Sequence, residues 1–256
     1  MMPSSREVQA LDSLLQWFQT PAGRDLARIE QQAVSDCLHQ RLMTDPCAFV
    51  VRVGGSWLGD KVLRQAPTAR CWALDWEAVA GSDALTGLEL LPLRKRSVDL
   101  LVLAHALDCS TDPDSLLREA AEVLAPEGDL LVIGFNAWST WGLRHLRGGP
   151  VSRWRQLPGA AGMALAVERH GLERRHQAYH CLQLPWPKGT PRPQPNRRWE
   201  QRLAPVLAGI HVLRARKRCP APISMKSLWQ SPADTAPGRL AQPTSRTRAH
   251  VQNRKT

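Results

Sequence analysis

The segment that decides the fold runs from Leu91 to Ile133. It opens with LPLRKRSVDLLVLA at residues 91–104 and closes with PEGDLLVI at residues 126–133. Each stretch contains a short, almost unbroken apolar run bounded by turn residues, which is typical of strands covered on both faces in a parallel sheet. The sequence therefore predicts two buried strands, Val98–Ala104 and Leu130–Phe135, joined by a connection long enough for a helix.

The connection between these two strands has the pattern of an amphipathic helix. Asp112 can cap its N-terminus, Pro113 suits the first helical position, and Pro126 with Gly128 should end it. Its apolar face is formed by Leu116, Leu117, Ala120, Ala121, Val123 and Leu124. A strand–helix–strand unit predicts an α/β fold whose ligand site lies at the carboxyl ends of the strands.

The same residues resemble a known family. The run LP-x-x-x-x-S-x-D followed by apolar residues, and then DPDSLLREAAEVLAPEG, is similar to class I S-adenosylmethionine-dependent methyltransferases of the type 11 kind over Leu91–Asn136. The resemblance implies a doubly wound, Rossmann-like, seven-stranded sheet, mostly parallel with an antiparallel last strand and with helices on both faces. It also implies S-adenosylmethionine as cofactor and methyl transfer to an acceptor molecule.

The rest of the chain supplies the remaining elements and the expected domain limits. Additional strands are expected at Cys47–Val53, Cys71–Asp75, near Leu88–Leu90, at Leu172–Leu184 and at Gly209–Arg216. We expect an N-terminal helical extension over residues 1–45, with Leu26, Ile29 and Ala33 of its second helix facing inward. A methyltransferase-like domain should follow over residues 46–218, with a Pro-rich insertion at 185–197, and a basic disordered tail over 219–256.

The net charge of +11 is concentrated near the C-terminus. Residues 214–256 hold ten Lys or Arg and one acid, Asp234, a net charge of +9, which leaves +2 for residues 1–213. A tail poor in apolar residues is expected to stay disordered and to touch nucleic acid only weakly. The nearly neutral body favours a small-molecule methyl acceptor.

Membrane and metal sites are not expected. No apolar run approaches the roughly 20 residues of a membrane-spanning helix, and Met1–Glu7 lacks the pattern of a signal peptide, so we expect a cytoplasmic protein. The six cysteines are scattered without a C-x-x-C pair. His176 and His180 lie about 13 Å apart if they share a strand, too far to bind one metal ion.

The turn Gly54-Gly55-Ser56 follows the first expected strand and is the candidate cofactor turn. Glycines let the backbone approach a ligand closely, and helix N-terminal N–H groups can bind a carboxylate. The family pattern here is D-x-G-x-G-x-G, but Arg52 stands at the acidic position and Ser56 at the second glycine. Because Arg cannot accept a hydrogen bond, this departure favours weakened, rearranged or lost cofactor binding.

Five further residues complete the implied cofactor site. Asp75 ends the second strand, where a carboxylate can accept hydrogen bonds from both ribose hydroxyls. The resemblance assigns Trp76, Glu89, Leu90 and Ala104 to the surroundings of the nucleoside.

Residues after the fourth and fifth strands are candidates for the acceptor site. His105 could act as a general base, or it could be a buried structural histidine. Asp108, Asn136 and Trp138 are expected to line the acceptor.

Two other functions stay open. The departures at Arg52 and Ser56 suit a catalytically degenerate, methyltransferase-like binding or scaffold protein. The run Gly54-Gly55-Ser56-Trp57-Leu58-Gly59 also resembles the G-x-G-x-x-G turn of nicotinamide-dependent enzymes with its middle glycine replaced, and Asp75 stands at a suitable distance.

Overall fold

The computed structural model describes the greater part of residues 1–219, the first of two units into which the chain divides. The described residues are 5–44, 47–63, 70–76, 82–87, 90–136, 139, 160–181 and 207–218. The site candidates Glu89 and Trp138 lie outside them, as does the expected Pro-rich insertion.

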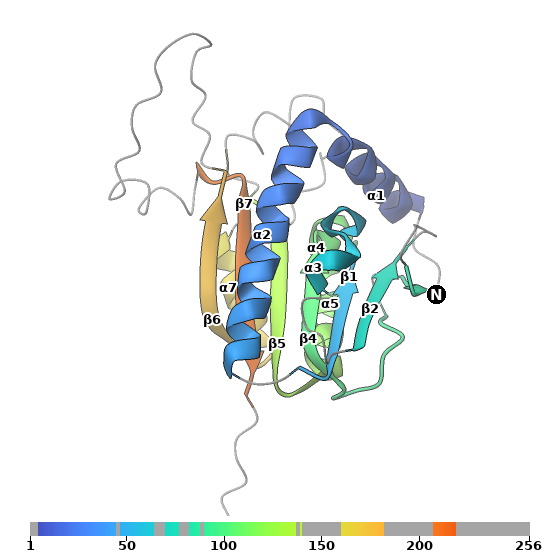
Figure 1. Ribbon diagram of the computed structural model, residues 1–256. Coiled ribbons are helices and arrows are strands. Elements are labelled where there is room, and N and C mark those ends of the chain that lie inside the picture. The colour runs from blue at the N-terminus through green and yellow to red at the C-terminus, as the bar shows by residue number, and fades with distance from the viewer. Residues whose placement is uncertain are drawn as a thin grey trace, which may run out of the picture. The chain divides into compact units, whose positions relative to one another are not determined.

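A seven-stranded sheet forms the centre of the first unit (Figure 1). Its order is β3-β2-β1-β4-β5-β7-β6, and β7 runs antiparallel to both of its neighbours while the other pairs are parallel. The strands are β1 (Phe49–Val53), β2 (Arg70–Asp75), β3 (Ala84–Leu85), β4 (Val98–Ala104), β5 (Leu124–Phe135), β6 (Leu172–His180) and β7 (Ile210–Lys217). The predicted seven-stranded, doubly wound sheet with an antiparallel last strand is confirmed.

Helices cover both faces of this sheet, as predicted. The helical elements are α1 (Ser5–Phe18), α2 (Pro21–Thr44), η1 (Ser56–Leu58), α3 (Asp60–Leu63), α4 (Ala106–Cys109), α5 (Pro113–Val123) and α7 (Ala160–Arg169). In Figure 1, α2 runs along the front of the sheet, α5 and α7 lie behind it, and α1 lies at the end toward which β1 points. None of the described helices is long and apolar enough to cross a membrane.

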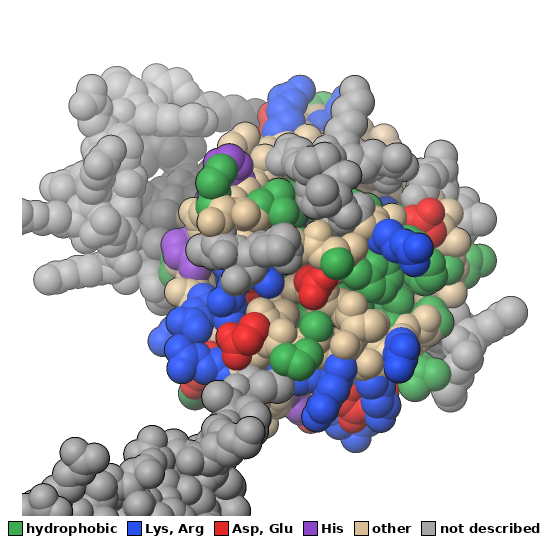
Figure 2. All heavy atoms as spheres, turned by 60° about the horizontal axis from the view of Figure 1, so that its bottom comes forward, with side chains coloured by type: hydrophobic (Ala, Val, Ile, Leu, Met, Phe, Trp, Pro, Cys, Tyr) green, Lys and Arg blue, Asp and Glu red, His purple; other side chains and the backbone are tan. Residues whose placement is uncertain are grey.

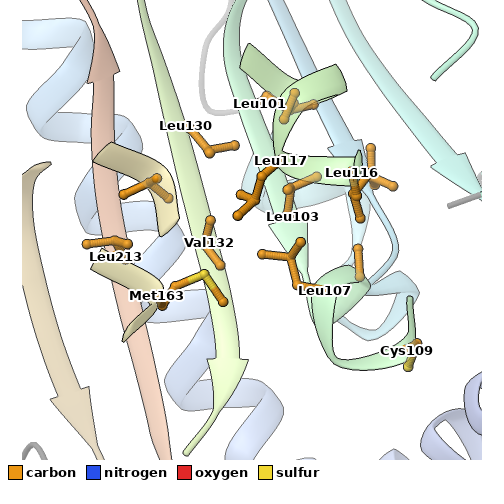
Figure 3. Packing of buried hydrophobic residues seen from close by; sticks show 14 of the residues in the cluster. Leu101, Leu103, Leu107, Cys109, Leu116, Leu117, Leu130, Val132, Met163 and Leu213 are labelled. Atoms are coloured by element: carbon orange, nitrogen blue, oxygen red, sulfur yellow. The ribbon is translucent and has the colours of Figure 1, made fainter. Parts of the chain in front are cut away.

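The packing between the sheet and its rear helices explains why the decisive segment folds as it does. Leu116 and Leu117 of α5 lie against the buried side chains of β4, among them Leu101 and Leu103 (Figure 3). The helix begins where the sequence predicted, because the Asp112 carboxylate accepts a hydrogen bond from the Ser115 backbone N–H at 3.1 Å.

Two predicted boundaries were wrong. Helix α5 ends at Val123 and β5 starts at Leu124, so Pro126 and Gly128 lie inside the strand rather than in a helix stop. A register shift between β4 and β5 accommodates them, at Val98 and Leu100. Strand β3 occupies Ala84–Leu85, and residues 88 and 89 of the expected strand lie outside the described residues.

The inward face of α2 also differs from the prediction. Ile29 is exposed, whereas its neighbour Glu30 is fully buried, in line with Leu26 and Val34. The helical spacing of these three inward residues is i, i+4 and i+8, so a carboxylate takes an apolar position on the face that contacts the sheet. A charge in that position requires a buried partner.

The amino ends of the parallel strands carry a buried ion cluster. Figure 2 turns this edge of the molecule forward and shows Lys and Arg side chains gathered on it, with acidic side chains between them. Asp129 of β5 is fully buried and pairs with Arg41 at 2.7 Å, Arg214 at 2.9 Å and Arg216 at 3.0 Å. Some of the C-terminal positive charge is therefore structural and belongs to β7 rather than to a tail.

Candidate functional site

The glycine turn lies at the carboxyl end of β1, beside the point where the strand order reverses between β1 and β4. Ligands of open α/β sheets bind at such switch points. Gly54 and Gly55 have φ angles of +72° and +68°, which side chains rarely tolerate. The Gly54 N–H donates to the Leu74 carbonyl at 2.9 Å, so the turn is fastened to the end of β2. Ser56 begins the short helix η1.

The open sides of both glycines are occupied by neighbouring protein groups. A Cβ atom on Gly54 would lie 2.6 Å from the Trp76 indole ring and 2.8 Å from the Ala104 carbonyl oxygen. A Cβ atom on Gly55 would collide with the Ala104 side chain and would lie 3.1 Å from Leu58. The missing side chains thus make room for packing in this arrangement, and the backbone is not bare toward a ligand.

Asp75 and Arg52 form a buried, two-pronged ion pair. Arg52 donates from Nη1 to Asp75 Oδ1 at 3.0 Å and from Nη2 to Oδ2 at 3.1 Å. The Ser82 hydroxyl donates to Oδ2 at 2.8 Å, and Arg52 Nη1 also donates to the Gly54 carbonyl. Both charged residues are only 2% exposed. Arg52, at the position where the family pattern has an acid, therefore neutralises the Asp75 carboxylate.

His105 lies at the end of β4 in a left-handed conformation, with φ +56°, and both of its ring nitrogens are engaged. Nδ1 lies 2.6 Å from the Asp108 carboxylate, and Nε2 lies 2.8 Å from the Glu30 carboxylate of α2. Burial alone lowers the pKa of His105, but the charge of Glu30 and the hydrogen bonds to both carboxylates outweigh it and raise the pKa to about 9. The fully buried ring is therefore an imidazolium at neutral pH.

Aromatic side chains from the N-terminal helices cover this charged group. Phe18, the last residue of α1, stacks on Trp57 with ring centroids 3.7 Å apart, and lies 5.7 Å from the His105 ring. The Trp57 indole N–H donates to Glu30 at 2.8 Å. The corner between α1 and α2 thus closes over the carboxyl ends of β1 and β4.

The expected acceptor residues that the structure describes are buried and engaged with the backbone. Asp108 accepts a hydrogen bond from the Phe135 N–H at 3.0 Å, and the Asn136 N–H donates to the Gly209 carbonyl at 2.9 Å. His211 of β7 lies beside Asp108 across Gly134. Burial lowers the pKa of His211 to about 4, the nearby Asp108 charge only partly opposing the shift.

The structure brings most of the predicted cofactor residues to one edge of the sheet. Gly54, Gly55, Asp75, Trp76 and Ala104 lie together there. Leu90 is 59% exposed, and its carbonyl accepts a hydrogen bond from the Thr86 hydroxyl at 3.0 Å.

Sequence reasoning missed three residues of this edge. Glu30 is hydrogen-bonded to His105, and Trp57 donates to Glu30. Ser82 donates to Asp75. The one available signal was the acid at i+4 between Leu26 and Val34 on α2. Within the described part of the chain, no three His, Cys, Asp or Glu side chains are arranged to hold a metal ion.

The strand order and the glycine turn of this edge have the arrangement of a methyltransferase-type sheet, whereas its side chains do not fit S-adenosylmethionine as they stand. A carboxylate offers about four lone-pair sites, and Asp75 uses three of them for Arg52 and Ser82. It cannot accept two ribose hydroxyls until one partner leaves. The indole of Trp76 lies against Gly54, where the family's turn is open to a ligand.

Comparisons with known proteins agree with the fold. Residues 68–132 match the family described as a methyltransferase domain. An uncharacterized Escherichia coli protein, YafS, is 52% identical over 56 residues, which are 22% of this chain and 23% of that protein. The match thus spans about a quarter of that relative.

Solved structures with the same fold cover most of the chain. A Thermotoga maritima S-adenosylmethionine-dependent methyltransferase aligns with a TM-score of 0.56 and 19% identity, over 79% of this chain and 93% of that one. A chain of a Haloferax volcanii complex between the Trm112 methyltransferase activator and a methyltransferase aligns with a TM-score of 0.55 and 18% identity, over 86% of this chain and 100% of that one. The [4+2]-cyclase SpnF aligns with a TM-score of 0.53 and 15% identity, over 86% of this chain and 98% of that one.

Identities this low carry the fold and not the reaction, as the cyclase illustrates. The family match covers the part of the chain from just before β2 into β5, and the strand order and antiparallel β7 extend the likeness beyond it. The resemblance of this chain to class I S-adenosylmethionine-dependent methyltransferases is therefore confirmed, in sequence over residues 68–132 and in fold over the described unit.

Proposed function

We propose that this chain is an S-adenosylmethionine-dependent methyltransferase acting on a small-molecule acceptor. The observation that carries the proposal is the junction of the glycine turn with the end of β2, through the Gly54 N–H and the Leu74 carbonyl at 2.9 Å. It sets Asp75 and two glycines of positive φ side by side at the switch point of a methyltransferase-type sheet. Residues 46–218 would form the catalytic domain.

The residues proposed to hold the cofactor are those already gathered at this edge. Asp75 would bind the ribose, and Gly54, Gly55 and Ser56 would face the amino-acid portion. Trp76 and Ala104 would border the nucleoside, with Glu89 and Leu90 as the remaining assignments. Bound cofactor would supply an electrophilic methyl group, and the Arg52 and Trp76 side chains would first have to move aside.

His105 is better suited to positioning than to proton transfer. Both of its nitrogens face carboxylates, and its raised pKa keeps it protonated at neutral pH, so it has no lone pair for a substrate proton. We assign it the role of holding Glu30 and Asp108 at the ends of β1, β4 and β5. Catalysis would then rest on orienting the acceptor, the main requirement of a direct methyl transfer. Asp108, Asn136 and Trp138 remain the proposed acceptor residues.

A small acceptor is supported by the charge and the cover of this edge. The body outside the last 43 residues is nearly neutral. Phe18 and Trp57 lie closely stacked above the ends of the strands, a cover that a small molecule would pass more easily than a macromolecule. Contact with nucleic acid is assigned only to the basic residues 219–256.

The test is calorimetric titration of the full chain with S-adenosylmethionine. We expect micromolar binding, and Asp75→Asn should weaken it about tenfold or more by removing charged hydrogen bonds. Asp36→Asn is the matched control, because Asp36 is an exposed acid on α2 that pairs with Gln32. Equal binding by the Asp75 variant would refute the ribose assignment.

One observation favours a second candidate, a methyltransferase-like binding protein without catalysis. The Arg52–Asp75 pair, together with Ser82, completes a buried network in which protein groups alone engage the Asp75 carboxylate. If the folded wild-type chain gives no heat with S-adenosylmethionine at millimolar concentration, this candidate replaces the first.

A further inference from the structure

A single residue, Arg52, removes the net negative charge that the family pattern would place at the carboxyl ends of β1 and β2. The family pattern places an acid where β1 ends, and an acid at the end of β2 would give two negative charges. Here Arg52 and Asp75 form one neutral, buried pair, so the edge is more positive by two charges. The difference acts where water is excluded, because both side chains are 2% exposed.

Two buried hydrogen-bond donors near the Arg52–Asp75 pair have no acceptor in the part of the chain that the structure describes. Among the described residues, the Nε of Arg52 and the indole Nε1 of Trp76 are buried and have no partner. A buried donor without an acceptor destabilises the fold, and such groups are commonly satisfied by a ligand or by water. Both donors belong to the two residues that lie against Gly54. A ligand that supplies acidic oxygens would satisfy them.

We infer that Arg52 sets the charge preference of this site, so that it favours adenosine ligands bearing an acidic group and binds cationic S-adenosylmethionine no more tightly than S-adenosylhomocysteine. The inference rests on the proposed function only in taking the edge to be a nucleoside site. S-adenosylmethionine carries one more positive charge than S-adenosylhomocysteine, at its sulfonium. An acidic ligand group would attract the Arg52 guanidinium and release the Asp75 oxygens for ribose.

The experiment compares four probes by calorimetry on the full chain: S-adenosylmethionine, S-adenosylhomocysteine, adenosine and adenosine 5′-monophosphate. For the wild type we expect the monophosphate to bind at least about tenfold tighter than adenosine, a ratio typical of one buried charge contact. S-adenosylhomocysteine should bind at least as tightly as S-adenosylmethionine.

Arg52→Gln should reduce the preference for the monophosphate over adenosine about tenfold. It should also strengthen S-adenosylmethionine binding relative to S-adenosylhomocysteine binding. Arg52→Lys retains the charge and should retain both preferences. Because a buried Asp75 without its partner could unfold the chain, the double variant Arg52→Gln, Asp75→Asn removes both charges together. It should likewise lose the preference for the monophosphate, and thermal unfolding verifies that each variant is folded.

The outcomes separate this inference from the proposed function. Tight S-adenosylmethionine binding that exceeds S-adenosylhomocysteine binding and ignores Arg52→Gln upholds the function and overturns the inference. Arg52-dependent binding of the monophosphate without S-adenosylmethionine binding does the reverse. If the folded wild type binds none of the four probes, both are overturned.

Discussion

Single residues at this edge are held by packing that leaves little freedom for substitution. Gly54 combines a φ of +72° with a Trp76 ring and an Ala104 carbonyl in the place of a Cβ atom. Gly171 provides a comparison, because its φ is +75° and nothing lies within 4 Å of its missing side chain. The pair separates the cost of backbone conformation from the cost of collision.

We expect Gly54→Ala to destabilise the fold by about 3 kcal/mol, through left-handed backbone strain together with overpacking. Gly171→Ala should cost only the backbone part, about 1 kcal/mol. Urea unfolding of the two variants measures the difference. Equal losses would mean that Trp76 and Ala104 give way freely, and that the turn is less tightly packed than its distances indicate.

At the scale of elements, α1 packs into the core through Leu11, Leu14 and, in its last turn, Phe18. Phe18 is almost completely buried, stacks on Trp57 and contacts the His105 ring. Phe18→Ala should therefore cost about 3–4 kcal/mol, the usual effect of removing a buried aromatic ring. Gln16→Ala, an exposed change on the same helix, should have almost no effect. Faster amide exchange in α1 of the Phe18 variant would locate the loss, and unaltered exchange there would contradict this attachment.

Elements were predictable to the extent that their stabilising contacts are local. The β4–α5–β5 unit follows from two apolar runs and the Asp112-Pro113 start, because neighbouring residues determine strand burial and helix capping. Glu30 was missed because its position on the inner face depends on His105, which is 75 residues away in the sequence. Local periodicity cannot reveal a charge pair of that separation.

The position of the candidate site could be predicted from the sequence, but the contacts between its residues could not. Asp75 and the glycine turn were expected at the carboxyl edge, and they lie there. Arg52 was recognised as a departure from the family pattern, yet its pairing with Asp75 depends on the register of β1 against β2. That register is a tertiary feature, which a strand pattern alone does not specify.

At the scale of the whole molecule, two buried histidines should shape the pH dependence of stability. The raised pKa of His105, about 9, gives a contribution complete below pH 6.5 and lost as the pH rises through 9. The lowered pKa of His211, about 4, gives a contribution present above pH 6.5 and lost as the pH falls toward 4. Each contribution is on the order of 3 kcal/mol.

We therefore expect the free energy of unfolding to be greatest near pH 6.5–7 and to fall on either side. Urea titrations across this range measure it. Glu30→Gln removes one of the two carboxylates that raise the His105 pKa, so it should make the alkaline limb shallower and leave the acidic limb in place. An unchanged alkaline limb would show that this histidine is not the group responsible.

Helix α2 is pinned by buried charges at two places along its length. Glu30 pairs with His105 at the carboxyl ends of the strands, and Arg41 pairs with Asp129 at their amino ends. Eleven residues of helix separate the two anchors, about 16 Å. The helix is expected to move as a rigid body. If its Glu30 end moves away from the sheet to admit a molecule, the helix must rotate about the Arg41 ion pair. Entry of a molecule at the carboxyl edge of the sheet would then change the forces on β5 and β7 at the amino edge.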